Sequence, residues 1–342
     1  MVKTTILVSL LLPSCETARY FMIETQTPAA VTFPVKSPAV VVVNNALVQP
    51  RDAGITVQYN GKTLPEQILQ KDSVQLSFFD FFASSLDESH YFRDVLMYNA
   101  PLRSDRDFLS TKKISPEKVR EITEAVDADG LISIDRLLFD VTHEIHDIQD
   151  NAGVFTLVAG KVEMSAHIPG RELASATVDV IDTLRFRRYV EADSLLVFKH
   201  LPEHFLENEA HALAEKATKC FAPYWTPSER VLYTGMDSRM KSAYAYVQKN
   251  RWKEAVDIWK ELYKNESGKK KKGMIAINIA LSEEMRDRYS SALEWVDKAL
   301  SLYALEHPFK VEEETEFAGK YRKRLEERAV QSTFLNRQLQ VK

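Results

Sequence analysis

The sequence predicts an α+β (α/β) amino-terminal domain with a mixed sheet, followed by an all-α helical repeat domain. Three observations indicate this fold: a β-branched run near residue 40, long alternating segments between residues 131 and 186, and helical stretches after residue 237 that match each other. A chain of 342 residues is also long enough for two domains. We place the α/β domain at residues 39–236 and the repeat domain at residues 237–342.

The α/β domain is expected to begin with a buried strand. Residues 39–43 read AVVVV, and an unbroken β-branched run is typical of a central strand. A helix is expected at residues 73–86, where five side chains fall on one stripe. These are Val74, Phe78, Phe81, Phe82 and Ser85. Ser115 and Pro116 then open a second helix, as an N-cap and a first helical residue.

A meander of three strands is predicted in the middle of the chain. The strands are expected at residues 131–148, 154–167 and 174–186. Asp182 interrupts the alternation of the third strand, so a bulge is expected near residue 181. A helix at residues 203–221 follows, and Cys220 near its apolar face is interpreted as a buried, inert thiol. Residues 230–234 are expected to form a last strand.

Two stretches of the repeat domain align with each other 37 residues apart, as from Ala243 to Ala280. Ala243, Tyr246, Trp252, Ala255, Trp259 and Leu262 occupy the same offsets as Ala280, Glu283, Tyr289, Ala292, Val296 and Ala299. This pattern resembles the tetratricopeptide repeat, whose period is ~34 residues. The extra length is assigned to a loop that contains Lys269–Lys272, and residues 311–339 are expected to cap the stack.

The start of the chain predicts a secretory signal at residues 1–14. Lys3 precedes a short apolar run, and small residues follow it. Leu12 to Cys15 resembles a bacterial lipobox, which implies acylation (a palmitate-type lipid) on Cys15 and a membrane anchor. Residues 15–38 would then be the lipidated terminus and an extended arm. A plain secretory signal with an accidental cysteine, or a wrongly assigned start, are the alternatives.

The lipobox-like start, the VVVVNNA strand, the α/β body and the helical repeats together resemble an uncharacterised family of Bacteroidetes lipoproteins. That resemblance implies a location in the cell envelope, on the outer or inner membrane, and implies no activity. The α/β body also resembles small envelope lipoproteins that assist larger outer-membrane or periplasmic assemblies.

Composition and motifs exclude several kinds of function. The net charge is −4 and the basic residues are dispersed, so no nucleic-acid partner is expected. The chain has two cysteines and no CxxC motif, and the glycine-rich and nucleophile-elbow motifs are absent, so neither a cofactor nor a catalytic residue is assigned. Acidic residues of the α/β domain leave an envelope hydrolase open as an alternative, and a small-ligand carrier is another.

Histidine clusters are the candidates for a metal site. His143 and His146 lie on a predicted strand, where they face opposite sides. His204 and His211 lie two helical turns apart, with His200 before them. Neither spacing matches the HExxH zinc motif, so we interpret both as polar faces and predict no metal.

We therefore predict a non-catalytic, membrane-anchored scaffold or adaptor that binds a protein or peptide through its repeats. The candidate partner-binding residues are Tyr246, Trp252, Trp259, Tyr289 and Trp295. For the three tryptophans, packing in the helical core is the alternative. The lysines at 269–272 could contact anionic lipid or an acidic partner, or form a solvated loop.

Overall fold

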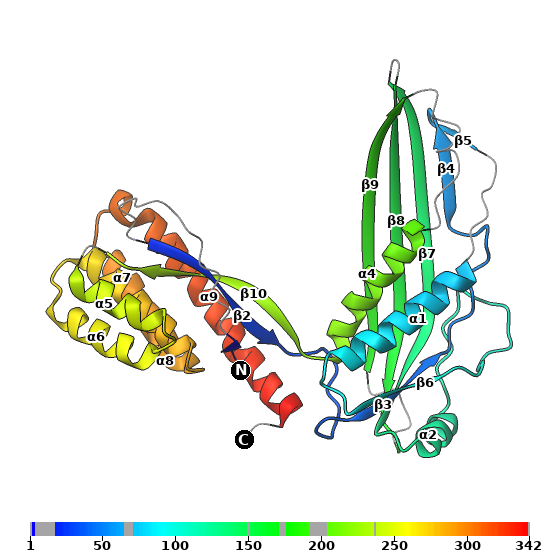
Figure 1. The fold of residues 1–342 in the computed structure, drawn as a ribbon, viewed down its shortest axis with the longest axis horizontal. Helices are drawn as coiled ribbons and strands as arrows, with labels where there is room; N and C mark the ends of the chain where they lie inside the picture. Colours follow the sequence, from blue (N-terminus) through cyan, green and yellow to red (C-terminus); the bar gives the residue numbers. More distant parts are fainter. Residues whose placement is uncertain are drawn as a thin grey trace. The chain divides into compact units, whose positions relative to one another are not determined.

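A computed structural model shows two compact units (Figure 1). It describes residues 2–3, 18–64, 71–148, 151–170, 176–191, 204–235 and 237–340. Residues 29–223 form one unit, which we call the α/β unit. Residues 1–28 and 224–342 form the other, the helical unit. These borders differ from the predicted ones at 38/39 and 236/237, because a strand from each end of the α/β segment pairs inside the helical unit.

The sheet of the α/β unit has seven strands built around one long strand, β7 (Gly130–Ile148). One edge of β7 pairs along its whole length with antiparallel β8 (Asn151–His167), which pairs with β9 (Ala176–Glu191). The other edge is shared by two parallel strands, β3 (Ala39–Asn44) and β4 (Ile55–Tyr59). The short strands β6 (Asp94–Tyr98) and β5 (Lys62–Thr63) complete the sheet. The mixed sheet is therefore as predicted.

Strand β3 confirms the interpretation of the AVVVV run. It lies between β6 and β7, and all five of these residues are buried. Between the ends of β3 and β4, the Gln49 side chain serves as a pairing partner for β7: its Oε1 accepts from the Phe139 N–H (2.8 Å) and its Nε2 donates to the Phe139 carbonyl (3.1 Å). The buried backbone of β7 is thus satisfied where no strand is adjacent.

Helices α1 (Lys71–Glu88) and α4 (His204–Phe221) pack against each other, and α4 packs on β8 and β9 (Figure 1). The buried stripe of α1 differs from the prediction at one position. Phe79 is buried, whereas Phe81 is 36% exposed and stacks on His211 of α4. Helix α2 (Pro116–Ala125) begins as predicted, because the Ser115 side chain accepts a hydrogen bond from the Lys118 N–H.

The predicted bulge near residue 181 is wrong. The β8–β9 ladder keeps one register over its whole length, and the irregularity of the meander lies in β7, between Ile134 and Arg136. Asp182 stays on the side that faces α4 because the Lys216 ammonium lies 3.1 Å from its carboxylate. An ion pair removes the need to turn the side chain away.

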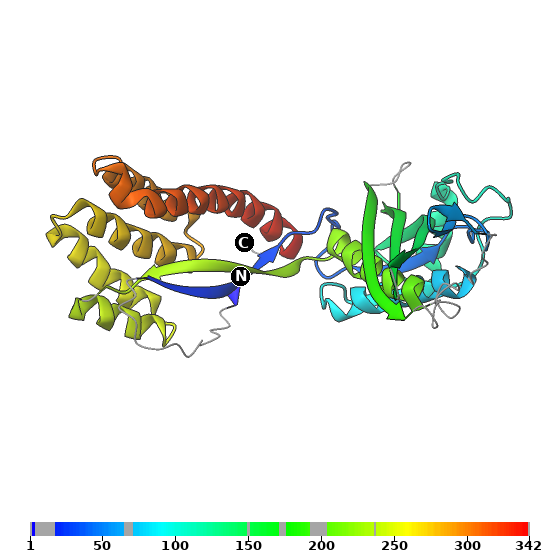
Figure 2. The ribbon, with the colours of Figure 1, turned by 90° about the horizontal axis from the view of Figure 1, so that it is seen from above.

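The helical unit contains a two-stranded ribbon in addition to its helices. Strands β2 (Ala18–Thr27) and β10 (Tyr224–Tyr233) pair antiparallel along ten residues (Figure 2), and β1 (Val2–Lys3) pairs with β2 at Glu24 and Thr25. The predicted extended arm therefore contains a strand. The Asn278 side chain bonds both the N–H and the carbonyl of Tyr233 (2.8 and 2.7 Å), which joins the ribbon to a helix.

From residue 237 onward every regular element in the described chain is a helix. The helices are α5 (Ser238–Val247), α6 (Trp252–Asn265), α7 (Lys269–Glu284), α8 (Tyr289–Tyr303) and α9 (Pro308–Leu339). Helix α9 packs on α8 and α7, where Tyr321 and Leu325 are buried. No helix among the described residues has the length and apolar character that crossing a membrane requires.

The pairs α5–α6 and α7–α8 are joined by turns of the same geometry. Asn250 and Asp287 have φ of 56° and 57°, and each accepts a hydrogen bond from the aromatic residue that begins the next helix. The turns lie 37 residues apart, which is the predicted period. The lysines at 269–272 form the first turn of α7, so the predicted loop is wrong. Lysine is a good helix former. Gly273, which follows them, has no Cβ and so allows the Tyr303 ring to pack closely against the helix.

Candidate functional site

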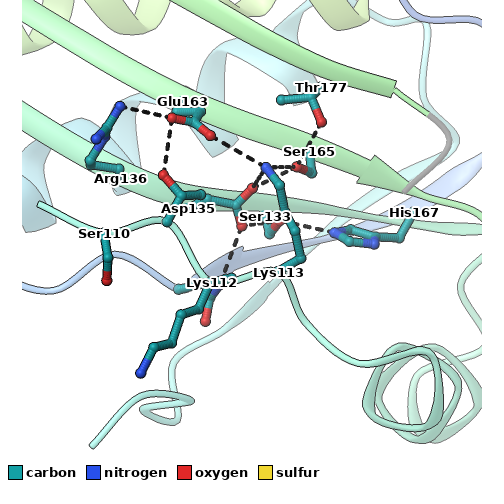
Figure 3. Close-up of polar contacts among 12 residues, drawn as sticks. Ser110, Lys112, Lys113, Ser133, Asp135, Arg136, Glu163, Ser165, His167 and Thr177 are labelled. Atoms are coloured by element: carbon teal, nitrogen blue, oxygen red, sulfur yellow. Dashed lines mark hydrogen bonds and ion pairs between the residues drawn. The ribbon is translucent and has the colours of Figure 1, made fainter. Parts of the chain in front are cut away.

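A buried polar network surrounds the bulge in β7 (Figure 3). Ile134 pairs with Met164 and Arg136 pairs with Glu163, so Asp135 is the extra residue without an opposite partner in the ladder. Its side chain is 0% exposed. A bulge re-aims the side chain it carries, and here it holds a carboxylate inside the α/β unit.

Four donors satisfy the Asp135 carboxylate. Oδ1 accepts from the Ser133 hydroxyl (2.7 Å) and the Asn45 amide (3.2 Å), and Oδ2 accepts from the Ser165 hydroxyl (2.5 Å) and the Lys113 ammonium (2.9 Å). Lys113 is partly exposed, so the network reaches the surface through one side chain. A buried charge needs this degree of pairing to be tolerated.

The network extends along β8 to Glu163 and His167 (Figure 3). Glu163 accepts from Arg136 (3.0 Å) and lies 3.5 Å from the Lys113 ammonium. The His167 Nε2 lies 3.1 Å from the Ser133 hydroxyl, and burial lowers the pKa of this imidazole. The neutral ring is therefore favoured at neutral pH.

The network has the residue types of a serine hydrolase without its arrangement. In a catalytic triad the carboxylate orients the histidine, whereas Asp135 bonds the serine hydroxyl. Ser133 and Ser165 are both 0% exposed, and Lys113 is committed to the carboxylate. The contact of Lys113 with Asp135 therefore holds the loop before α2 against the sheet. The two serine hydroxyls are not accessible to a substrate.

A cavity of about 320 Å³ lies beside this network, at the carboxyl ends of β3 and β6. We call it the α/β cavity. Ligands of α/β proteins often bind at the carboxyl ends of parallel strands. Asn45 belongs to both sites, and Gln75 of α1 donates to the Asn44 Oδ1 (3.2 Å). Among the described residues that line the cavity, Asp72 is the single carboxylate, so this lining lacks the acid pair that glycoside hydrolysis uses.

A second cavity, of about 570 Å³, lies in the helical unit and is called the helical cavity. Its lining residues are Tyr233, Gly235, Asp237, Met240, Glu266, Gly268, Lys269, Lys270, Lys271, Met274 and Glu306. The tyrosine and the two methionines make its interior apolar, while charged residues surround it. Flexible methionines adapt to ligands of varied shape.

The lysines of α7 are paired with acidic groups at this cavity. Lys270 lies 2.7 Å from Glu314, and Lys271 lies 2.8 Å from Glu266. The Lys269 ammonium donates to the Leu305 carbonyl (3.2 Å). Two of the four lysine charges in this turn are therefore paired with carboxylates, which weakens its attraction for a lipid surface.

The structure separates the five predicted partner-binding residues into two groups. Trp252, Trp259 and Tyr289 are buried in the helical core, so they stabilise the fold and are not accessible to a partner. Tyr246 and Trp295 are partly exposed. Trp259, in the middle of α6, is 0% exposed within the hydrophobic core of the helical unit, where α6 packs on α5 and α7.

The other predicted sites do not converge. His143 is buried with Nδ1 2.7 Å from the Thr156 hydroxyl, and His146 pairs with Glu144 on the opposite face, as the strand pattern predicts. His211 bonds Ser77 (3.0 Å). The His204 ring lies 4.4 Å from the Phe205 ring and is tilted by 58° against it, while His200 lies outside the described residues.

Of the two cysteines, Cys15 also lies outside the described residues. Cys220 is free and partly buried, and burial raises the pKa of its thiol. A raised pKa disfavours the reactive thiolate, in agreement with the expected inert role.

The sequence reading missed Asp135 and Lys113. A signal was present: Ser133 and Asp135 interrupt an otherwise apolar run in the strand predicted at residues 131–148. A charged residue at a core position of a strand needs a partner. The partner, Lys113, lies in a loop 22 residues earlier, and no local pattern links the two.

The fold and these sites define a two-unit protein with a mixed α/β unit and a helical unit. A family model described as a domain of unknown function (DUF8603) matches residues 38–233, which is more than half of the chain. The chain therefore belongs to this family. A second model, described as a domain of unknown function (DUF6340), matches residues 241–327. No curated protein matches the chain.

Several solved structures are similar to part of the chain. PelC, a dodecamer from Paraburkholderia phytofirmans, is 11% identical over 60% of this chain and 98% of its own, with a TM-score of 0.23. A putative neuraminyllactose-binding hemagglutinin homolog from Helicobacter pylori is 11% identical over 57% and 91%, with a TM-score of 0.27. XCC0632 from Xanthomonas campestris is 9% identical over 56% and 85%, with a TM-score of 0.23. At these scores the similarities carry no functional argument.

Proposed function

We propose that this protein is a non-catalytic adaptor of the cell envelope, anchored through a lipid on Cys15, which binds a segment of a partner protein in the helical cavity. The observation that carries the proposal is the helical cavity itself. Its size falls in the range of ligand sites, and its apolar interior with a charged rim fits an amphipathic peptide.

Two exposed apolar side chains belong to the segment whose backbone carbonyls, at residues 305 and 310, accept hydrogen bonds from the rim lysines. Phe309 is 85% exposed and Leu305 is 64% exposed. Leu305 precedes Glu306, which lines the cavity, and its carbonyl accepts from Lys269 of the rim. Exposed apolar residues beside an apolar cavity are typical of a protein interface. A bound segment would extend from the cavity over these two residues.

The rim charges favour a partner that carries both signs of charge. Lys271 with Glu266, and Lys270 with Glu314, present alternating charges around the opening. Such a rim contributes specificity and orientation more than affinity. The apolar side chains of the partner would supply most of the binding free energy.

The repeated turns support a tetratricopeptide-like assignment of α5 to α8. Asn250 and Asp287 have nearly equal φ, and each accepts a hydrogen bond from the aromatic residue that begins the next helix. Tetratricopeptide-like arrays bind extended peptides on a concave face. Here Trp252, Trp259 and Tyr289 fill the helical core, so we assign binding to the cavity at the end of the array.

Site-specific photocrosslinking in native envelopes tests the proposal. A photoreactive amino acid replaces Lys269 at the rim, or Glu294 on the solvent side of α8 as a matched control. We expect a defined crosslinked protein from position 269 and none from position 294. Met274→Glu should reduce the crosslink at least tenfold, because it places a charge in an apolar cavity, whereas Met274→Leu should preserve it. Equal crosslinking from both positions, or an unaffected Met274→Glu chain, would overturn the proposal.

The lipid anchor is tested separately. Cells are labelled with an alkyne analogue of palmitate, and the native chain is compared with Cys15→Ser. We expect label and membrane association in the native chain and loss of both in the variant. Label that persists in Cys15→Ser would contradict the anchor and leave the peptide site unaffected.

A further inference from the structure

Strand β9 is a long edge of the sheet in the α/β unit. Its 16 residues pair with β8 alone among the strands of the described chain. The register is continuous from the Asn151–Glu191 pair to the Ala166–Ala176 pair. The strand contains no proline, glycine or bulge, which are three of the features that protect an edge from pairing with another strand. It does carry charged side chains, so the pairing that it allows depends on how these charges are matched.

The face of β9 that points away from α4 carries exposed apolar and charged side chains. Ile181 and Tyr189 are each 55% exposed. The Arg187 guanidinium lies 4.8 Å from the Tyr189 ring centre and 5.2 Å from that of Phe155 on β8. These stacked groups order the outer end of the strand and keep it extended. The edge is therefore both long and preorganised.

We propose that β9 pairs antiparallel with β9 of a second copy of this chain, about a two-fold axis at Thr183. Opposite residues of an antiparallel ladder lie on the same face, so the axis must pass through a residue. With Thr183 at the centre, Asp179 of each copy lies opposite Arg187 of the other. The symmetry therefore forms two ion pairs on the outer face.

The neighbouring registers are less favourable. An axis at residue 182 places Asp182 against itself, and an axis at residue 185 places Arg185 against itself. An axis at residue 186 places Arg185 opposite Arg187. Like charges directly opposite each other destabilise a ladder. An axis at residue 184 forms no ion pair. Thr183 is thus the centre at which the charge pattern complements itself.

One side chain must move for the pairing. The half-exposed Lys216 ammonium donates to the Ile181 carbonyl (2.5 Å) and to the Asp182 carboxylate (3.1 Å). On pairing it keeps only the contact with Asp182, and the carbonyl accepts from the second copy. Lysine is flexible and well hydrated, so this exchange costs little compared with a ladder of many hydrogen bonds.

Disulfide crosslinking tests the register in the full chain with both native cysteines replaced, by Cys15→Ser and Cys220→Ser. Thr183→Cys places two thiols across the axis. Opposed Cα atoms in a ladder lie about 4.5–5.5 Å apart, which suits a disulfide. Thr177→Cys is the matched control, because its two copies would lie roughly 40 Å apart at about 3.3 Å per residue. We expect covalent dimers from Thr183→Cys at least tenfold faster than from Thr177→Cys.

A charge swap tests the ion pairs independently. Light scattering measures the dimer dissociation constant. We expect Asp179→Arg, and separately Arg187→Asp, to weaken the dimer at least tenfold, and the double variant to restore it. A native chain that is monomeric at 100 µM, equal crosslinking from both thiol positions, or a double variant as weak as the single ones would overturn the proposal.

Discussion

Glu209 makes the stability of the α/β unit depend on pH. This residue of α4 is 0% exposed, and its Oε1 accepts from the Gly160 N–H (3.0 Å). Among the described residues, no group lies within full hydrogen-bond geometry of its Oε2, although the Leu184 backbone N–H acts weakly on the carboxyl. Burial, with a smaller contribution from the nearby Asp182 carboxylate, raises the pKa of Glu209 from 4.5 to about 7. Below about pH 7 the folded protein therefore holds this carboxyl mainly in its protonated form.

The sign and size of the effect follow from this pKa. Because the folded chain holds the proton more tightly than the unfolded chain, this contribution is fully present below pH 4.5 and is lost as pH rises through about 7. At about 1.4 kcal/mol per pKa unit, the loss is about 3 kcal/mol at most. Such an amount is a large fraction of the stability of a domain.

The perturbation is Glu209→Gln, which keeps an acceptor for the Gly160 N–H and removes the titrating proton. Urea unfolding is measured from pH 5 to pH 8 for both chains by far-ultraviolet circular dichroism. We expect the difference between their free energies of unfolding to change by about 2–3 kcal/mol in favour of Gln over this range. Other titrating groups cancel in the difference.

Two controls locate the effect. Glu215→Gln on the same helix removes an exposed carboxylate that pairs with Lys219, so its pH dependence should match the native chain within about 0.5 kcal/mol. The four tryptophans, at 225, 252, 259 and 295, all lie in the helical unit, so their emission reports unfolding of that unit separately. Parallel curves for the native chain and Glu209→Gln between pH 5 and pH 8 would refute the reasoning.

Three further predictions follow from buried groups. Arg230→Ala removes the bidentate partner of the Glu284 carboxylate, whose side chain is 2% exposed. We expect the free energy of unfolding, measured in urea by tryptophan emission, to fall by about 3–5 kcal/mol. A fall of less than about 1 kcal/mol would contradict this. Gly160→Ala places a Cβ 2.7 Å from the Glu209 Oε1 and should lower the free energy of unfolding by about 1–3 kcal/mol. The same substitution in a chain that also carries Glu209→Ala should lower it by less. Equal losses in the two chains would show that the two positions are not coupled. Burial lowers the pKa of His167 below 6.5, so its contribution to stability is lost as pH falls through that value. We therefore expect the free energy of unfolding of the native chain, measured relative to His167→Gln by circular dichroism in urea, to be lower at pH 5 than at pH 7.5. The same difference at both pH values would exclude the effect.

The elements that could be predicted from the amino-acid sequence are those with a local pattern of residues. The AVVVV strand was predicted from an unbroken β-branched run, all of which is buried, and helix α2 was predicted from its start at Ser115 and Pro116. The meander and the helix pairs were predicted from the period of two or about 3.6 residues that burial of one face imposes. The spacing of 37 residues between the helix pairs was predicted because similar residues recur at matching positions in the two stretches. Such patterns depend on residues close together in the chain.

The pairing of segments that are distant in the chain could not be predicted in this way and is seen in the folded protein. Strand β2 pairs with β10, which lies some 200 residues later in the chain. Because of this pairing, the borders of the α/β unit lie at residues 28/29 and 223/224 and differ from the predicted ones. Asp135 meets Lys113 through a bulge and a loop, and Trp259 is buried in the core that the helices around α6 form. Each outcome depends on which of many compatible surfaces meet, and that choice is made by the packing of the whole unit, which no local period records.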